Sequence, residues 1–282
     1  MHNIGLIGLG NIGSYYTRQL LGAGYPLYVC DIDGPRVARA VEQGAIACDD
    51  PAELAARADI ILLSLPGSPQ VEQVMDGERG ILAAVHAGQL VIDTGTTRPE
   101  TDIRYHRLCA EKGVGYLDAP ITWRKQGLTM MAGGTPEDYE RGLKVLKCVG
   151  FKVLHVGPIG TGQVLKLANQ VILAGQMAVW SEAVEFTRMA GLDPTLLRDY
   201  LEFPITPGLE GNEFSGGGQL ALHYKDLIYA IDYAHQAGIS LPITSQVHEI
   251  FKATKNYGDA NWIQTGIVTY WRRMNARDNE NK

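Results

Sequence analysis

A glycine motif close to the N-terminus restricts the possible folds of this chain more than any other feature. The residues Gly8-Leu9-Gly10-Asn11-Ile12-Gly13 follow the apolar run Ile4–Ile7 and open the amphipathic segment Ile12–Leu21. A strand, a tight glycine turn and a helix in this order form the start of a dinucleotide-binding unit, in which free N–H groups of the first helical turn face a pyrophosphate. The motif therefore predicts such a unit, with a glycine turn that binds nothing as the alternative.

A carboxylate about 20 residues after the motif indicates which cofactor binds. Asp31 directly follows the second apolar run, Leu27–Cys30. In NAD sites an acidic side chain at this place binds the ribose hydroxyls, and it would repel the 2′-phosphate of NADP. The sequence therefore predicts NAD. Arg36 keeps NADP open as the alternative, because its guanidinium could turn toward the ribose.

The first half of the chain alternates apolar runs with amphipathic segments. The runs that predict strands are Ile4–Ile7, Leu27–Cys30, Ile60–Leu65, Leu90–Asp93, Gly115–Leu117 and Lys152–Val156. The segments that predict helices are Ile12–Leu21, Pro35–Glu42, Pro51–Ala58, Val71–Met75 and Pro99–Lys112. Asp50 before Pro51 has the chemistry of a helix N-cap. Such alternation is typical of an α/β fold with a doubly wound parallel sheet, and we assign residues 1–161 to this Rossmann domain.

The second half has a different pattern. From Val164 to Ala190 there is no proline, and apolar residues recur at helical spacing. This pattern predicts one long helix that joins the two halves and ends at Gly191, with a new helix starting at Asp193-Pro194. The remaining segments predict helices interrupted by glycine and proline. We therefore expect residues 162–282 to form an all-helical substrate and oligomerisation domain.

A lysine and an asparagine stand near the start of the long predicted helix. Lys166 and Asn169 are three residues apart, so they share a helix face. A lysine in the first helical turn lies at the positive end of the helix dipole, and burial among Leu165 and Leu167 would add a desolvation cost. Both effects lower the pKa of a lysine toward the range that suits proton transfer. The alternative is a solvated surface lysine.

Composition excludes several classes of protein. The formal net charge of −6 argues against a general nucleic-acid binder. The four cysteines form no CxxC pair, and neither they nor the scattered histidines have metal-ligand spacing, so we expect reduced thiols and no metal. The longest apolar stretches are too short to cross a bilayer, and the chain opens directly into a predicted strand. We therefore expect a cytoplasmic protein without a membrane or nucleic-acid partner.

Taken together, five segments resemble the β-hydroxyacid dehydrogenase family over about residues 3–265. They are Gly8–Gly13, Ser64-Leu65-Pro66, Asp118-Ala119-Pro120, Gly160-Thr161-Gly162 through Lys166 and Asn169, and Lys225-Asp226-Leu227. The resemblance implies an oxidoreductase that transfers hydride between NAD and a small β-hydroxy acid or related hydroxy anion, with an aldehyde or semialdehyde as the oxidised form. It also implies a homodimer or homotetramer formed through the helical domain.

The resemblance also implies roles for individual residues. Lys166 would exchange a proton with the substrate hydroxyl, and Asn169 would hold the substrate and orient the lysine. Lys225 would close over the cofactor from the second domain. The residues implied to bind the cofactor are Gly8, Leu9, Gly10, Asn11, Ile12, Gly13, Asp31, Leu65, Pro66, Thr96 and Lys225.

The chain departs from the family pattern in two places. Gly95 stands where the family usually has serine, and the glycine-rich segment after Asp118-Ala119-Pro120 is shortened. Thr122 can keep the hydroxyl of the family serine, whereas Trp123 and Arg124 replace the glycine amides that hold the substrate carboxylate. Arg124 could bind an anionic group through two parallel hydrogen bonds, and Trp123 could form a wall of the pocket. A substrate that carries a sulfonate or a second carboxylate is therefore an alternative.

Other functions stay open beside this one. The altered segment after Pro120 would fit a catalytically silent NAD-binding module, although an intact Lys166 and Asn169 argue against it. Imine reductases share the expected architecture but usually replace the lysine. A 6-phosphogluconate dehydrogenase would need a much longer helical domain.

Overall fold

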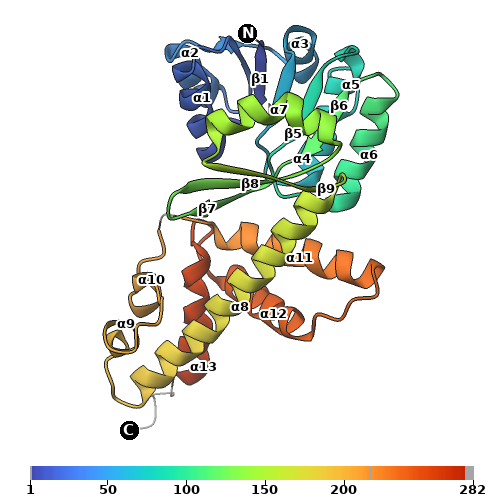
Figure 1. Ribbon diagram of the computed structural model, residues 1–282. Helices are drawn as coiled ribbons and strands as arrows, with labels where there is room; N and C mark the ends of the chain where they lie inside the picture. The colour runs from blue at the N-terminus through green and yellow to red at the C-terminus, as the bar shows by residue number, and fades with distance from the viewer. Residues whose placement is uncertain (1, 216, 277–282) are drawn as a thin grey trace. The chain divides into compact units, whose positions relative to one another are not determined.

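The computed structural model describes residues 2–215 and 217–276 (Figure 1). The chain divides into two compact units, Met1–Lys166 and Leu167–Lys282. The first is an α/β unit and the second is helical, so the expected fold class is confirmed. No helix in the described part of the chain combines the length and apolar character that crossing a membrane requires.

A mixed sheet organises the first unit. Its strands are β1 Ile4–Ile7, β2 Leu27–Cys30, β3 Ile46–Ala47, β4 Ile60–Leu63, β5 Leu90–Asp93, β6 Gly115–Asp118, β7 Ile121–Arg124, β8 Gly127–Gly133 and β9 Lys152–Gly157. Among the residues described, the order is β3-β2-β1-β4-β5-β6-β8-β7, with β9 paired to β8. Neighbours from β3 to β6 are parallel, whereas β8 runs antiparallel to β6 and β7.

Helices cover both faces of this sheet. They are α1 Asn11–Gly22, α2 Gly34–Glu42, α3 Pro51–Arg57, α4 Ser68–Met75, α5 Ile81–Ala84, α6 Pro99–Ala110 and α7 Pro136–Val149. Alternate residues of β4 enter two separate cores: Leu62 joins one and Leu63 the other, and both are fully buried. A strand that is apolar on both faces is what a doubly wound sheet requires. Asp50 caps α3 by accepting a hydrogen bond from the Glu53 N–H at 2.8 Å, as expected.

Four features of this unit differ from the sequence expectations. The segment after Pro120 is a β-hairpin, in which β7 and β8 are joined by the two residues Lys125 and Gln126. The short helix α5, helix α7 and the two-residue strand β3 are also additional. Helix α7 begins with a local signal, because the Thr135 hydroxyl accepts a hydrogen bond from the Asp138 N–H at 3.1 Å and Pro136 follows the cap.

The long helix α8, Thr161–Met189, has 29 residues and confirms the predicted one, three residues longer at its start. It ends as expected at Gly191, whose φ is +80°. The Gly191 N–H donates to the Arg188 carbonyl and the Leu192 N–H to the Thr187 carbonyl, a pattern that closes a helix C-terminus. The other helical elements are α9 Thr195–Asp199, α10 Pro207–Glu210, α11 Leu220–Gln236, α12 Pro242–Tyr257, η1 Gln264–Ile267 and α13 Val268–Asn275.

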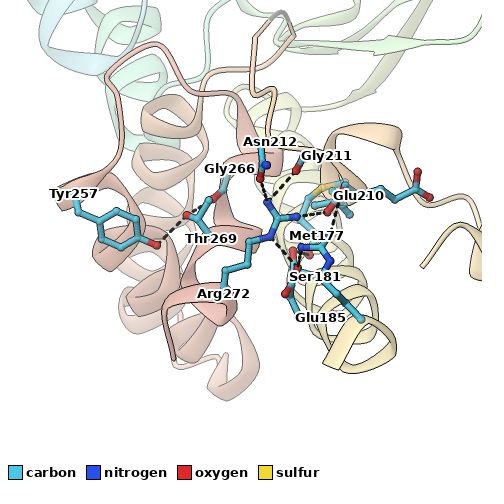
Figure 2. A network of polar contacts seen from close by, with 12 residues as sticks. Met177, Ser181, Glu185, Glu210, Gly211, Asn212, Tyr257, Gly266, Thr269 and Arg272 are labelled. Carbon is cyan, nitrogen blue, oxygen red and sulfur yellow. Dashed lines mark hydrogen bonds and ion pairs between the residues drawn. The ribbon is translucent and has the colours of Figure 1, made fainter. Parts of the chain in front are cut away.

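A buried carboxylate, Glu185, connects the C-terminal end of α8 to other elements of the second unit through hydrogen bonds. Glu185 is 3% exposed and accepts hydrogen bonds at 2.8 Å from both Arg188 and Arg272 (Figure 2). Arg272, on α13, also donates to Asn212 at 2.7 Å and to the Leu209 carbonyl at 2.9 Å. Two cations on one buried carboxylate offset its desolvation cost. The network therefore has a structural role, holding α8, α10 and α13 together.

Candidate active site

The candidate site of the first unit lies at the carboxyl edge of its parallel strands. Strands β1, β4, β5 and β6 are neighbours, so the segments that follow them leave the sheet side by side. These segments contain the glycine motif, Ser64-Leu65-Pro66, Thr94–Thr97 and Asp118–Pro120. The chain order reverses between β1 and β4, and ligands of open α/β sheets bind at such a switch point. The fold thus brings together motifs that are far apart in the sequence.

The glycine motif has the shape of a phosphate cradle. Gly8 has a φ of +91°, and a Cβ there would overlap the Ser64 carbonyl oxygen. A Cβ on Gly13 would overlap the Gly8 carbonyl oxygen. Gly10 precedes α1 without a side-chain cap, and a Cβ on it would meet only Arg36, at 3.9 Å. The open space and the first N–H groups of α1 therefore fit the pyrophosphate of a dinucleotide.

Asp31 lies beside this cradle. Its carboxylate accepts hydrogen bonds from the Leu9 N–H at 2.5 Å and from the Asp33 N–H at 2.8 Å. Arg36 is paired with Asp33 at 3.1 Å. A carboxylate fixed at the end of β2 suits the two hydroxyls of a ribose, as the sequence spacing predicted.

The departure at Gly95 has a physical reason. A Cβ on Gly95 would lie 2.7 Å from the Leu65 carbonyl oxygen and 3.1 Å from the Asp93 carboxylate. The Gly95 N–H donates to the same carboxylate at 2.8 Å. The close approach of the segments after β4 and β5 therefore requires glycine here. It also brings Leu65 next to the segment that carries Thr96, which is half-buried.

Lys166 is buried near the start of α8, with 8% of its surface exposed. Asn169, one turn further, is half-buried and donates to the Gln170 side-chain oxygen at 3.0 Å. The carboxylate of Asp118 accepts hydrogen bonds from the backbone N–H groups of Gly160 and Gln163, both at 2.7 Å. Burial raises the pKa of Asp118 to about 7, although these two hydrogen bonds act to lower it. Asp118 thus caps the helix that carries Lys166.

From the sequence, Asp118 was predicted only to belong to the Asp118-Ala119-Pro120 motif. Gln163 was not predicted to be a functional residue. The side chain of Gln163 is fully buried. Its spacing from Lys166 was the available signal, since residues three apart share a helix face.

The hairpin after Pro120 carries the three residues expected to contact the substrate. Thr122 is buried, whereas Trp123 and Arg124 are exposed. The Trp123 ring meets the Tyr15 ring edge-on, with 5.6 Å between centroids. Because Tyr15 lies on α1, two residues after Gly13, the hairpin is attached to the helix that begins at the glycine motif.

The second unit places Lys225 on α11. Its Nζ lies 3.0 Å from the Asp226 carboxylate and 4.9 Å from the centre of the Tyr229 ring. The other Asp226 oxygen accepts a hydrogen bond from the Gln170 side chain at 2.6 Å. Lys225 is therefore linked, within this unit, to the α8 residue four positions after Lys166.

The switch-point cradle and the buried lysine define the candidate site of a dinucleotide-dependent oxidoreductase. Residues 3–157 match the model described as the NAD binding domain of 6-phosphogluconate dehydrogenase. Residues 160–204 and 205–271 match the model described as the NAD-binding domain of NADP-dependent 3-hydroxyisobutyrate dehydrogenase.

Relatives cover nearly the whole chain. The chain is 31% identical to 2-(hydroxymethyl)glutarate dehydrogenase of Eubacterium barkeri, over 96% of this chain and 95% of that protein. It is 32% identical to 2-hydroxy-3-oxopropionate reductase of Escherichia coli, over 94% and 95%. The solved structure of Mycobacterium tuberculosis 3-hydroxyisobutyrate dehydrogenase with L-serine superposes with a TM-score of 0.85 at 26% identity, covering 96% and 99%. The chain belongs to the β-hydroxyacid dehydrogenase family.

The comparisons confirm the expected family and fold, the class of enzyme and the class of cofactor, because both matched models describe NAD-binding domains. The roles of individual residues and the domain boundary at residue 161 stay predictions.

Proposed function

We propose that this protein interconverts a small β-hydroxy acid and the matching aldehyde or semialdehyde, with NAD as the hydride carrier. The observation that carries the proposal is a buried lysine, Lys166, at the start of a helix in the same unit as a dinucleotide cradle. The three relatives named above support it. The substrates in their names share a carboxylate with an oxygen substituent on the β-carbon.

The chain's own groups supply the proton chemistry in this proposal. Nicotinamide, when bound, exchanges a hydride with the substrate carbon. Lys166 takes the hydroxyl proton during oxidation and returns it during reduction, and Asn169 holds the substrate on the same helix face. Lys166 is the sixth residue of α8 and only 8% exposed, so in this proposal the proton moves in a site largely closed to water.

The preference for NAD rests on Asp31. Its carboxylate is fixed by two backbone N–H groups beside the cradle, so a 2′-phosphate would meet a negative charge. Arg36, the residue that could favour NADP, is paired with Asp33 at 3.1 Å. We therefore infer a preference for NAD over NADP.

A spectrophotometric assay tests this function. The purified protein is supplied with NAD or NADP and a panel of short β-hydroxy acids, hydroxysulfonates and hydroxydicarboxylates. Formation of the reduced cofactor with at least one β-hydroxy acid, faster with NAD, is the expected result. Tight binding of NAD without turnover in either direction across the panel would contradict it and would favour a catalytically silent NAD-binding module.

The hairpin supports a second candidate, a reductase for a sulfonate or dicarboxylate semialdehyde. This chain has a two-residue turn in the segment where the family pattern has a glycine-rich loop. Arg124 is the last residue of β7 and lies next to that turn. If Arg124 binds the second anionic group, Arg124→Ala should raise KM for a dianionic substrate about 10- to 100-fold, because charged hydrogen bonds contribute roughly 1.5–3 kcal/mol.

The control for Arg124 is Lys125→Ala in the adjacent turn, which removes the same charge from an exposed side chain. KM for a monoanionic β-hydroxy acid should stay constant in both variants. An equal change for both substrates, or an equal effect of the two variants, would exclude a specific contact with Arg124.

We also infer that the protein is a homodimer or homotetramer. Ile172, Val179 and Phe186 recur every seven residues on α8 and are 61%, 62% and 77% exposed. An apolar stripe of this kind favours a helix partner. Light scattering should give the mass of two or four chains, and Val179→Glu should lower it. The mass of one chain for the unmodified protein would contradict the inference.

The cytoplasmic location and the absence of a nucleic-acid partner stay predictions from the sequence.

A further inference from the structure

Both the oxygen and the nitrogen of the Gln163 side-chain amide form hydrogen bonds within the first unit. Its Oε1 accepts a hydrogen bond from the Thr97 N–H at 3.1 Å, and its Nε2 donates to the Gly95 carbonyl at 3.2 Å. These two backbone groups stand on either side of Thr96. The side chain of Gln163 is fully buried, so water does not replace either hydrogen bond.

The backbone N–H of Gln163 also forms a hydrogen bond within the first unit. It donates to one oxygen of Asp118 at 2.7 Å, while the Gly160 N–H donates to the other. Gly162 leaves room for this arrangement, because a Cβ there would lie 2.7 Å from the Asp118 carboxylate. Lys166 follows three residues later on the same helix face, about 4.5 Å further along the axis.

We propose that Gln163 is a positioning residue: its hydrogen bonds hold the start of α8, and with it Lys166, in a fixed position relative to the segment that carries Thr96. The inference rests on the proposed function, in which Lys166 moves the proton, and on the cofactor-binding role that the family resemblance implies for Thr96. A single amide joins the first turn of α8 to the segment after β5. Rotation or sliding of that turn would break one or both hydrogen bonds of Gln163 and move Lys166 with them.

An amide matches both partners of Gln163, and so does a protonated carboxyl group of the same length. One partner is a donor and the other an acceptor, and an ionised carboxylate has no proton to donate to the Gly95 carbonyl. Acidic groups surround the site: Asp93 accepts from the Gly95 N–H, Asp118 from the Gln163 N–H, and Asp102 from the Thr97 hydroxyl at 2.6 Å. Tyr116, whose hydroxyl donates to Asp102 at 2.9 Å, and Lys166 on the same helix are the other titratable groups near this cluster in the described part of the chain.

Gln163→Glu provides the test. At neutral pH its kcat should be about 10- to 100-fold below that of the unmodified enzyme, with little change in KM for NAD, because the loop contact is lost while the cradle is intact. The ratio of the variant kcat to the unmodified kcat should rise as the pH falls, since the introduced carboxyl group, once protonated, can again both accept and donate. Gln163→Leu should lose activity without this recovery.

Two further measurements separate positioning from general destabilisation. Gln246→Glu, an exposed change on α12, should leave the pH profile unaltered. Hydrogen exchange of the Thr97 amide should be faster in Gln163→Leu than in the unmodified protein, whether or not a substrate has been found. A kcat ratio independent of pH, or unchanged exchange at Thr97, would overturn the proposal. Absence of turnover by the unmodified enzyme, with faster exchange in the variant, would instead contradict the proposed function alone.

Discussion

Replacing Lys166 with alanine should lower kcat about 10²- to 10⁴-fold, the usual contribution of a general acid–base group. The Kd for NAD should change little, because the glycine motif and Asp31 lie in the segments that follow β1 and β2, away from α8 in the chain. Lys166 is buried close to the helix terminus that Asp118 caps. It is also the only lysine in α8, so no neighbouring lysine of this helix can replace it as the proton carrier. Single-turnover reduction of NAD in the presence of substrate measures the effect directly.

Lys166→Arg is the matched control for this prediction. Arginine keeps the positive charge and most of the length but does not release its proton at accessible pH. Its kcat should therefore be as low as that of the alanine variant, while substrate binding is better retained. Turnover within a few fold of the unmodified enzyme in either variant would exclude Lys166 as the proton carrier.

Gly13→Ala should weaken NAD binding about 10- to 100-fold and lower the free energy of unfolding by roughly 1–3 kcal/mol. A Cβ on Gly13 would overlap the Gly8 carbonyl oxygen, so either α1 or the turn before it must shift. The N–H groups at the start of α1 would then no longer face the pyrophosphate. Isothermal titration with NAD and chemical denaturation measure the two effects.

Gly22→Ala tests whether the effect belongs to the cradle. Gly22 is the last residue of the same helix, and a Cβ there would meet no atom within 4 Å. Alanine is the better helix former by roughly 0.5–1 kcal/mol, so this variant should be at least as stable as the unmodified protein and bind NAD equally well. Equal NAD affinity in both variants would contradict a pyrophosphate site at Gly8–Gly13.

Local patterns were sufficient for much of the first unit. A strand buried on both faces is apolar throughout, as in β4, and a helix start such as Asp50-Pro51 carries its cap in the sequence. The start of α7 has the same kind of signal in Thr135-Pro136, which could have been read in the same way. The hairpin β7–β8 was not predicted, because Trp123-Arg124-Lys125-Gln126 has no glycine or asparagine at the turn itself.

The inner contacts of the site could not be predicted from one sequence. Asp118 reaches the start of α8 more than forty residues further along the chain, and Gln163 reaches back to Gly95 and Thr97 over a still greater separation. Such contacts depend on which strands become neighbours in the sheet, and no local spacing records that. The glycine at position 95 is a similar case, since a Cβ there would crowd the Leu65 carbonyl oxygen and the Asp93 carboxylate, contacts that the sequence does not show.

The short turn between β7 and β8 has a consequence for how this scaffold can diversify. Strand β8 is held from its other side by β9, and by β6 at its end, so its register does not depend on the Lys125-Gln126 turn. Inserting residues there costs little loop entropy and leaves the core untouched. Under the proposed role of the hairpin, changes in length at this surface turn should alter substrate preference, while the residues proposed to bind the cofactor and move the proton stay in place.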